Sequence, residues 1–321
     1  MERAEPLFRF GVVADVQYAD IEVGTNFACT VRRYYRHALV ALHAAVQCWR
    51  EADVSFVAQL GDLIDGQNAS AGATDAAMAS VLAALAPLGP AIPIYHCIGN
   101  HEALNWQRDG SLLRALDYGA RSYRAWSPHP RWRFVMLDPF FISTIGWPDG
   151  HPNAMAAWKL LDMHNPTDCR RRGVDLSIGL RGLERRWMPY NGAHGAEQLA
   201  WLDAELRSAV ADEQKVVILT HVAVAPGACS DDCLAWDFDA CLALLHGAGA
   251  GAVVAVLSGH DHAGGYVRDD AGVHHVTFCA PLETAPPNAC HAVVAVHESG
   301  LVVQGYGRQP SFNLHFCEKA I

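Results

Sequence analysis

Five short polar clusters, each directly following an apolar run, constrain this sequence more than any other feature. The clearest run spans residues 56–60 and leads into two carboxylates, Asp62 and Asp65, with glycines on both sides. A short apolar run bounded by turn residues predicts a buried strand, and ligands of an open α/β sheet bind beyond the carboxyl ends of its strands. The same placement recurs for four further clusters, which contain Asp15 and Gln17, Asn100 and His101, His221, and His260 and His262.

The order of the expected elements predicts an α/β fold. Strands are expected at residues 7–16, 56–60 and 94–98, with helices at 30–52 and 75–85 between them and Thr30 as the N-cap of the first helix. This alternation predicts parallel strands joined by right-handed crossovers. The last three expected strands, at residues 273–278, 292–296 and 301–306, would form a second, more antiparallel sheet. The later elements are helices at 154–163, 196–210 and 237–246 and strands at 134–137, 215–220, 252–257, 273–278, 292–296 and 301–306.

We expect one domain over residues 1–321, an α/β sandwich of four layers in the order α-β-β-α, with two facing mixed sheets and outer helices. The pattern weakens between about residues 104 and 194, where Gly, Pro, Arg and Trp are frequent. Long irregular stretches inside a compact domain are usually functional or disordered, and the aromatic side chains here favour order. We therefore expect an ordered insertion that covers the site.

Charge and composition exclude several classes of partner. The formal net charge of −10 argues against nucleic acid or an anionic membrane surface as the main partner. No apolar run approaches the length of a membrane span, and residues 1–10 lack the apolar segment of a signal peptide. The 10 cysteines are scattered, and the closest pair, Cys229 and Cys233, lacks a second pair to complete a zinc site. We expect a cytoplasmic monomer with reduced thiols.

Oxygen and imidazole side chains in the five clusters are suited to a pair of metal ions. Two-metal hydrolysis of phosphate esters uses ions about 3.5–4 Å apart, a separation that one carboxylate can bridge. Taken singly, each residue has an ordinary alternative as a turn residue or, for His221, as a core histidine. Together and in this order they favour a metal centre. The expected ligands are Asp62 as the bridge, Asp15 and Gln17 in one site, Asn100 and His221 in the other, and His260 and His262 with one in each.

Gln17 bears on the identity of the metal. Its amide oxygen is a harder ligand than an imidazole nitrogen, and a change from nitrogen to oxygen favours Mn²⁺ or Mg²⁺ over Zn²⁺. We therefore expect two divalent ions, with Mn²⁺ preferred and Mg²⁺ as the alternative.

These motifs resemble those of the calcineurin-like metallophosphoesterase superfamily. The matching patterns are Gly-Asp-x-x-Asp-Gly, Gly-Asn-His-Glu, a lone His and Gly-His-Asp-His. The usual first motif of the superfamily is Asp-x-His, and Gln17 stands where that histidine would be. This departure resembles the manganese-dependent ADP-ribose/CDP-alcohol diphosphatase branch, as do residues 32–37, 190–192, 233–236 and 283–286. The resemblance extends from about residue 8 to residue 310.

The resemblance implies a role for each motif residue. His101 resembles the catalytic histidine of the superfamily, which faces the substrate phosphate and can protonate the leaving oxygen. Asp65 resembles the carboxylate paired with that histidine, and a simple turn cap is its alternative. The implied ligands are Asp15, Gln17, Asp62 and His262 for the first ion and Asp62, Asn100, His221 and His260 for the second.

The reaction implied by the resemblance is hydrolysis of a diphosphate that joins a nucleoside to a sugar or an alcohol. ADP-ribose would give AMP and ribose 5-phosphate, and CDP-alcohols such as CDP-choline would give CMP and a phosphoalcohol. The alternatives are a cyclic nucleotide phosphodiesterase, another metallophosphoesterase, or a non-catalytic scaffold, which lost ligands would mark. Cys233 and Trp236 are candidates for the substrate pocket, because aromatic faces suit a base, and core packing is their alternative.

Overall fold

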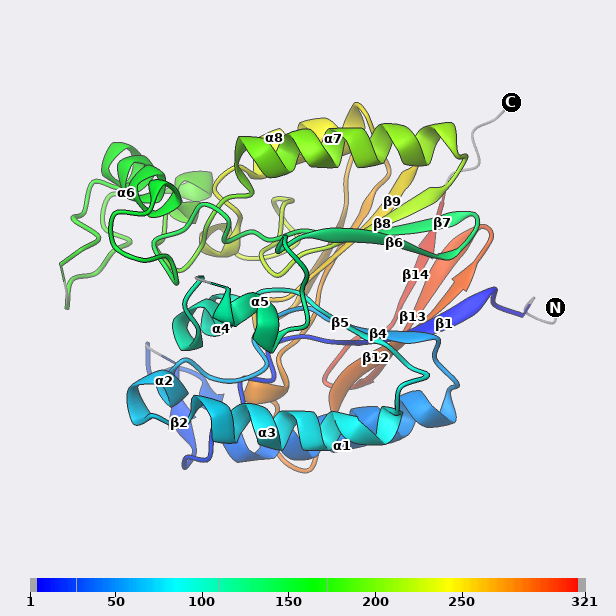
Figure 1. Ribbon diagram of the computed structural model, residues 1–321, viewed down its shortest axis with the longest axis horizontal. Helices are drawn as coiled ribbons and strands as arrows, with labels where there is room; N and C mark the ends of the chain where they lie inside the picture. Colours follow the sequence, from blue (N-terminus) through cyan, green and yellow to red (C-terminus); the bar gives the residue numbers. More distant parts are fainter. Residues whose placement is uncertain (1–4, 27, 109, 172, 317–321) are drawn as a thin grey trace.

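The computed structural model describes residues 5–26, 28–108, 110–171 and 173–316. Within these ranges two mixed sheets of six strands face each other, and helices cover their outer surfaces (Figure 1). The layers therefore follow the order helices, sheet, sheet, helices. The four-layer α/β sandwich expected from the sequence is confirmed.

The first sheet contains the parallel core that the sequence predicts. β1 (Phe8–Val13), β4 (Phe56–Gln59) and β5 (Ile94–His96) are parallel neighbours in that order. The crossovers between them contain α1 (Tyr35–Glu51) and α3 (Thr74–Leu85). Both helices lie on the outer face of this sheet (Figure 1), and α1 turns a stripe of Ala, Leu, Val and Trp side chains inward.

The second sheet has parallel pairing at its centre and antiparallel strands at both edges. α7 (Gly195–Ala211) and α8 (Phe238–His246) lie on its outer face (Figure 1). From one edge to the other, its strands are β10 (Gly265–Arg268), β11 (His274–Thr277), β9 (Val253–Ser258), β8 (Lys215–Leu219), β7 (Trp132–Met136) and β6 (Arg124–His129).

Three phenylalanine rings from both sheets form the centre of the core. Phe10 of β1 stacks on Phe56 of β4 with the ring centroids 5.0 Å apart, and Phe134 of β7 stands edge-on to both rings. All three are at most 2% exposed. Burial of each ring stabilises the fold by roughly 1.5–3 kcal/mol. This packing holds the two sheets face to face, so the polar residues at the strand ends of both sheets can meet.

The expectation of a separate antiparallel sheet is wrong. β12 (Cys290–His297) pairs with β1, and β13 (Gly300–Gly307) and β14 (Phe312–His315) continue the first sheet from there. The remaining expected strand, β11, pairs in parallel with β9 of the second sheet. Hydrophobic alternation indicates that a strand has a buried face but does not specify its neighbour, and the pairing of β1 with β12 joins distant parts of the chain.

The first helix begins at Tyr35 and not at Thr30. The side chain of Asn26 accepts hydrogen bonds from the backbone N–H groups of Thr30 (2.8 Å) and the residue after it (3.1 Å), which turns the chain. The short strands β2 (Gly24–Thr25) and β3 (Arg32–Arg33) then pair with each other. Asn and Thr favour side-chain-stabilised turns as well as helix caps, and here the turn forms.

The stretch at about residues 104–194, which was expected to be an insertion, contributes β6 and β7 to the second sheet. Its irregular part therefore begins after β7. It contains α6 (Pro152–His164), as predicted, and a small hydrophobic cluster around Trp187, to which Trp236 contributes from outside the stretch. The remaining short elements are α2 (Gln67–Ala71), α4 (Asn100–Asn105), α5 (Ser111–Ala115) and the 3₁₀ helices Ala86–Leu88, Gly182–Arg186, Asp231–Cys233 and Pro281–Glu283.

Two observations bear on the environment of the protein. Among the residues described, no helix is long and apolar enough to cross a membrane. Cys97, Cys241, Cys279 and Cys290 are buried free thiols. Burial raises the pKa of Cys97 well above its usual value, so this thiol stays protonated and unreactive.

Candidate metal centre

The polar clusters meet at the carboxyl ends of strands from both sheets. Asp15 follows β1, Asp62 follows β4 and His221 follows β8. One ligand atom of each of these residues lies within 4.8 Å of the other two, and all three side chains are buried. The two facing sheets therefore gather carboxylates and an imidazole from distant parts of the chain into one site.

Asp62 lies at the centre of this site. Its Oδ2 is 3.0 Å from Nε2 of Gln17 and 3.4 Å from Nε2 of His221. Its Oδ1 accepts a hydrogen bond from the backbone N–H of His101 (2.9 Å). Burial raises the pKa of Asp62, but His221 and His101 lower it by more, so the pKa is well below the usual range. An ionised carboxylate between Gln17 and His221 has the position that a bridging ligand requires.

One group of candidate ligands lies on the Gln17 side of Asp62. Nε2 of His262 is 2.9 Å from Nε2 of Gln17 and 3.5 Å from Oδ1 of Asp15. Oδ2 of Asp15 accepts a hydrogen bond from the backbone N–H of His260 (2.9 Å), which fixes the carboxylate. A half-turn of the Gln17 amide would present Oε1 in place of the NH₂ group, and Oε1 is the atom that a cation would bind.

The second group lies on the His221 side. His221 donates through Nδ1 to the backbone carbonyl of Leu60 (2.7 Å), which leaves Nε2 facing the centre. Nδ1 of His260 is 3.2 Å from that Nε2. Burial and the charge of His221 lower the pKa of His260 to about 3, so the His260 ring is neutral. Asn100, the remaining predicted ligand of this ion, is buried at the start of α4. The division of the ligands between two ions stays a prediction.

The electrostatic environment of the site favours cations. Burial lowers the pKa of His221, but the carboxylates of Asp62 and Asp15 outweigh it and raise the pKa to about 10. Burial likewise lowers the pKa of His262, and Asp15 and Glu283 raise it to about 9. The carboxylates thus hold protons on two buried rings. A divalent cation would take the place of those protons, because metal binding releases protons from its ligands.

Three buried oxygen atoms of the candidate ligands find no hydrogen-bond partner in the part of the chain that the structure describes. They are Oδ1 of Asp15, Oε1 of Gln17 and Oδ1 of Asn100. Buried polar atoms are nearly always paired, so oxygens of this kind in one site suit a bound cation. Oxygen donors combined with imidazoles suit Mn²⁺. The oxygen donors also suit Mg²⁺. The residues present therefore fit two divalent ions.

The backbone at the site adopts an uncommon conformation. Asp15, Gln17, Asp62 and His260 have φ angles of 52°, 43°, 61° and 69°, in the left-handed region that non-glycine residues seldom adopt. Such conformations cost about 1–3 kcal/mol each and persist where surrounding structure imposes them. Four of the seven candidate ligands are therefore held by strained turns, which aim their side chains across the strand ends.

His101 lies at the rim of the site, with its side chain 16% exposed and Nε2 3.8 Å from Oδ2 of Asp62. The backbone N–H of Gly66 donates to Nδ1 (2.6 Å), which fixes the ring. Oδ2 of Asp65 is 3.5 Å from the same nitrogen, at the outer limit of a hydrogen bond, and Oδ1 accepts from the backbone N–H of Gln67 (2.8 Å). Asp65 thus holds the turn through Oδ1, while its Oδ2 finds no hydrogen-bond partner among the described residues. Its pairing with His101 stays a prediction.

Glu102 supports the site, a role that was not predicted for it from the sequence. Its carboxylate accepts hydrogen bonds from the backbone N–H groups of Asp62 (2.7 Å), Leu63 (2.6 Å) and Gly99 (2.8 Å). The side chain is fully buried, and burial next to Asp62 raises its pKa to about 7. Glu102 therefore ties the end of β4 to the start of α4, which sets Asp62 beside Asn100.

Two further residues contact the site histidines and were not predicted as site residues. Glu283 lies 2.8 Å from His262, and Asn191 lies 2.8 Å from His260. Histidines that bind metals almost always use their second nitrogen to bond a carboxylate or carbonyl. Metal-binding histidines were therefore expected to have hydrogen-bond partners of this kind. The sequence alone does not indicate which of its many polar residues these partners are.

The two predicted substrate residues lie in different environments. Trp236 is 2% exposed, packs against Trp187 and donates its indole N–H to the carbonyl of Met188 (3.1 Å). Its ring packs into the hydrophobic cluster around Trp187, so the core-packing alternative applies to it. Cys233 is half-buried, and burial raises the pKa of its thiol well above the usual value.

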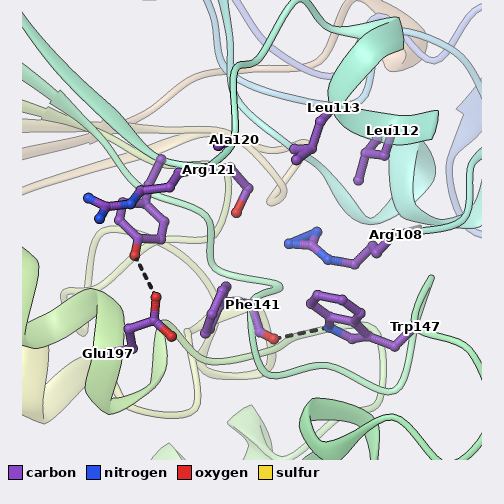
Figure 2. Close-up of a pocket in the computed structure, with 10 residues that line it drawn as sticks. Arg108, Leu112, Leu113, Ala120, Arg121, Phe141, Trp147 and Glu197 are labelled. Carbon is purple, nitrogen blue, oxygen red and sulfur yellow. Dashed lines mark hydrogen bonds between the residues drawn. The ribbon is translucent and has the colours of Figure 1, made fainter. Parts of the chain in front are cut away.

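A separate pocket of about 130 Å³ lies beside α5 (Figure 2). Arg108 points into it from above the ring of Trp147, 4.9 Å from the ring centroid, and the Tyr123 hydroxyl donates to Glu197 across one wall (3.1 Å). The seven candidate ligands do not line this pocket. Arg108 also forms a buried ion pair with Asp138, which joins the α4–α5 segment to the end of β7.

Comparison with known proteins identifies the family. The family model for calcineurin-like phosphoesterases matches residues 8–264, and the chain belongs to this family. Two proteins named manganese-dependent ADP-ribose/CDP-alcohol diphosphatase, from Arabidopsis thaliana and Homo sapiens, are 38% and 34% identical to it. These matches cover 96% of this chain in both cases and 96% and 93% of those proteins.

Solved structures agree with the assignment. A dimetal phosphatase from Danio rerio is 35% identical, with a TM-score of 0.89 over 98% of this chain and 100% of that chain. A purple acid phosphatase from yellow lupin has a TM-score of 0.50 at 13% identity, covering 97% of this chain and 53% of that one, and shares the fold alone. The resemblance drawn from the sequence motifs is therefore confirmed.

Replacement of Gln17 is expected to change the preference for metals. Gln17→His exchanges an amide oxygen for an imidazole nitrogen, so activity should shift from Mn²⁺ toward Co²⁺ and Zn²⁺. Gln17→Ala should weaken metal dependence without a comparable change in preference. The measurement is activity in titrations with Mn²⁺, Mg²⁺, Co²⁺ and Zn²⁺ for the three proteins. Superimposable metal profiles would show that Gln17 is not a ligand.

Proposed function

We propose that this protein is a manganese-dependent hydrolase that cleaves the diphosphate of ADP-ribose and of CDP-alcohols, CDP-choline among them. Similarity over nearly the full length to relatives of that name carries the proposal. ADP-ribose and water would give AMP and ribose 5-phosphate, and a CDP-alcohol and water would give CMP and a phosphoalcohol. The oxygen-rich site around Gln17 supports the choice of Mn²⁺.

The chemistry follows from the donor set. Two divalent ions held by Asp15, Gln17, Asp62 and His262 on one side, and by Asp62, Asn100, His221 and His260 on the other, would polarise the phosphate oxygens and supply an activated water. His101 lies partly exposed at the rim, with Nδ1 fixed by Gly66 and Nε2 free to donate a proton to the leaving phosphate oxygen. Glu102 holds Asp62 in place during this reaction.

The alternatives are less well supported. A non-catalytic scaffold is expected to have lost ligands, whereas all seven candidate ligand residues are present in this chain. A cyclic nucleotide phosphodiesterase would use the same metal chemistry, and the substrate panel below separates it from a diphosphatase. We further propose that the protein acts as a monomer in the cytoplasm, where the buried thiols would stay reduced.

The expected products provide the direct test of the activity. With Mn²⁺, ADP-ribose should yield AMP, and CDP-choline should yield CMP, without release of inorganic phosphate. The assay is nucleotide chromatography with a phosphate determination on the same samples, and Asp62→Asn serves as the inactive control. Inorganic phosphate as the first product, or turnover restricted to cyclic nucleotides, would contradict the proposal.

A further inference from the structure

The two site histidines closest in sequence are held by different supports. Nδ1 of His262 lies 2.8 Å from Oε1 of Glu283. An ionised carboxylate only accepts hydrogen bonds, so Nδ1 of His262 must carry a proton. The other nitrogen, Nε2, then faces Gln17 and Asp15. Glu283 therefore determines that His262 offers Nε2 to the site.

Asn191 holds His260 in the opposite orientation, with Nδ1 rather than Nε2 toward the site. The side chain of Asn191 is fully buried, and its NH₂ group donates to the carbonyls of Arg186 (2.9 Å) and Asp232 (2.8 Å). Its oxygen is therefore the atom that meets Nε2 of His260 at 2.8 Å. That nitrogen must donate, so Nδ1 is the ring nitrogen left to bind a metal, and it faces His221.

Arg33 is the anchor of Glu283. Its Nε lies 3.3 Å from Oε1 of Glu283, and the two side chains are 23% and 8% exposed. The neighbouring arginines are arranged differently, because Arg32 is exposed and Arg36 pairs with Asp20 on the surface (2.6 Å). Arg33 thus differs from its neighbours in reaching toward the metal centre through an acidic side chain.

We propose that Glu283, anchored by Arg33, and Asn191 are positioning residues that each control one half of the metal centre. Glu283 fixes His262 to bind through Nε2, and Asn191 fixes His260 to bind through Nδ1. This inference deepens the proposed function and rests on it. It assigns a role to one residue in each of the stretches 32–37, 190–192 and 283–286, namely Arg33, Asn191 and Glu283. Loss of one support should weaken one ion and leave the other.

The test is the binding of Mn²⁺ to the purified protein, measured by calorimetry and by electron paramagnetic resonance. Glu283→Ala and Asn191→Ala should each weaken one Mn²⁺ site by about 10- to 100-fold. At Mn²⁺ levels that fill the unaltered protein, each variant should lose the spectrum of a coupled ion pair and show that of an isolated ion. Glu283→Gln, which keeps an acceptor without the charge, should recover part of the affinity.

Matched arginine variants separate a specific anchoring role of Arg33 from a general effect of positive charge near the site. Arg33→Gln should weaken one Mn²⁺ site by about two- to five-fold, the size expected of a partly exposed ion pair, and Arg32→Gln should leave Mn²⁺ binding unchanged. Equal losses for both arginines, or equal weakening of both ions in the Glu283 and Asn191 variants, would overturn the inference. Because no substrate is present, these readouts are independent of whether ADP-ribose is hydrolysed. Circular dichroism melts establish that each variant is folded.

Discussion

Replacement of His101 by Ala should lower kcat by about two to four decades, the usual contribution of a general acid or base. Mn²⁺ content should stay the same, because the side chain of His101 lies at the rim and is outside the seven candidate ligands. Its ring is fixed through Nδ1 by Gly66 and presents Nε2 beside Asp62. Removal of the ring thus takes away the proton donor and leaves the groups that hold the ions.

The measurement is steady-state turnover of ADP-ribose at saturating Mn²⁺, with the metal content of the same samples determined by mass spectrometry. His43→Ala, on the exposed side of α1, is the matched control and should retain full turnover. Asp65→Asn should have a smaller effect than His101→Ala, since Gly66 still fixes the ring. Near-normal turnover of a metal-replete His101→Ala protein would exclude His101 from the mechanism.

The grouping of Asp15, Asp62 and His221 could be predicted because these residues follow strands, and the burial of a strand is a local property. The apolar run before Asp62 requires both faces of β4 to be covered, and parallel strands bring their carboxyl ends to one edge. The groups containing Asp15, Asp62 and His221 could therefore be placed together without knowledge of the loops. Gln17 was informative for a similar reason, since the hardness of a ligand atom does not depend on the fold.

The parts that could not be predicted depend on contacts between distant segments. β12 pairs with β1, but its alternating pattern suits any half-buried position. The left-handed conformation of Asp62 and the contact of Asn191 with His260 depend on the closed structure around them. The environment of Trp236 could not be predicted either. A tryptophan near a site looks the same in the sequence whether its ring stacks on a substrate or fills a core.

The second large effect is expected at the ion pair between Arg108 and Asp138. Their side chains are 4% and 0% exposed, and Asp138 also accepts the backbone N–H of Phe140 (2.9 Å). Arg108→Met would leave the Asp138 carboxylate buried without its partner, which typically costs about 3–5 kcal/mol in the free energy of unfolding. The pair joins the α4–α5 segment to the end of β7, so its loss should also loosen the segment that carries His101.

Urea denaturation of the single and double variants measures this cost. Arg185→Met breaks a more exposed pair with Asp232 (3.3 Å; side chains 47% and 26% exposed) and should cost about 1 kcal/mol at most. Combining Arg108→Met with Asp138→Leu should recover much of the loss, because two apolar side chains leave no buried charge. A small effect of Arg108→Met, similar to that of Arg185→Met, would show that water or another residue compensates Asp138. A double variant no more stable than the single one would show that the structural role of Arg108 lies in its packing against Trp147 rather than in its charge.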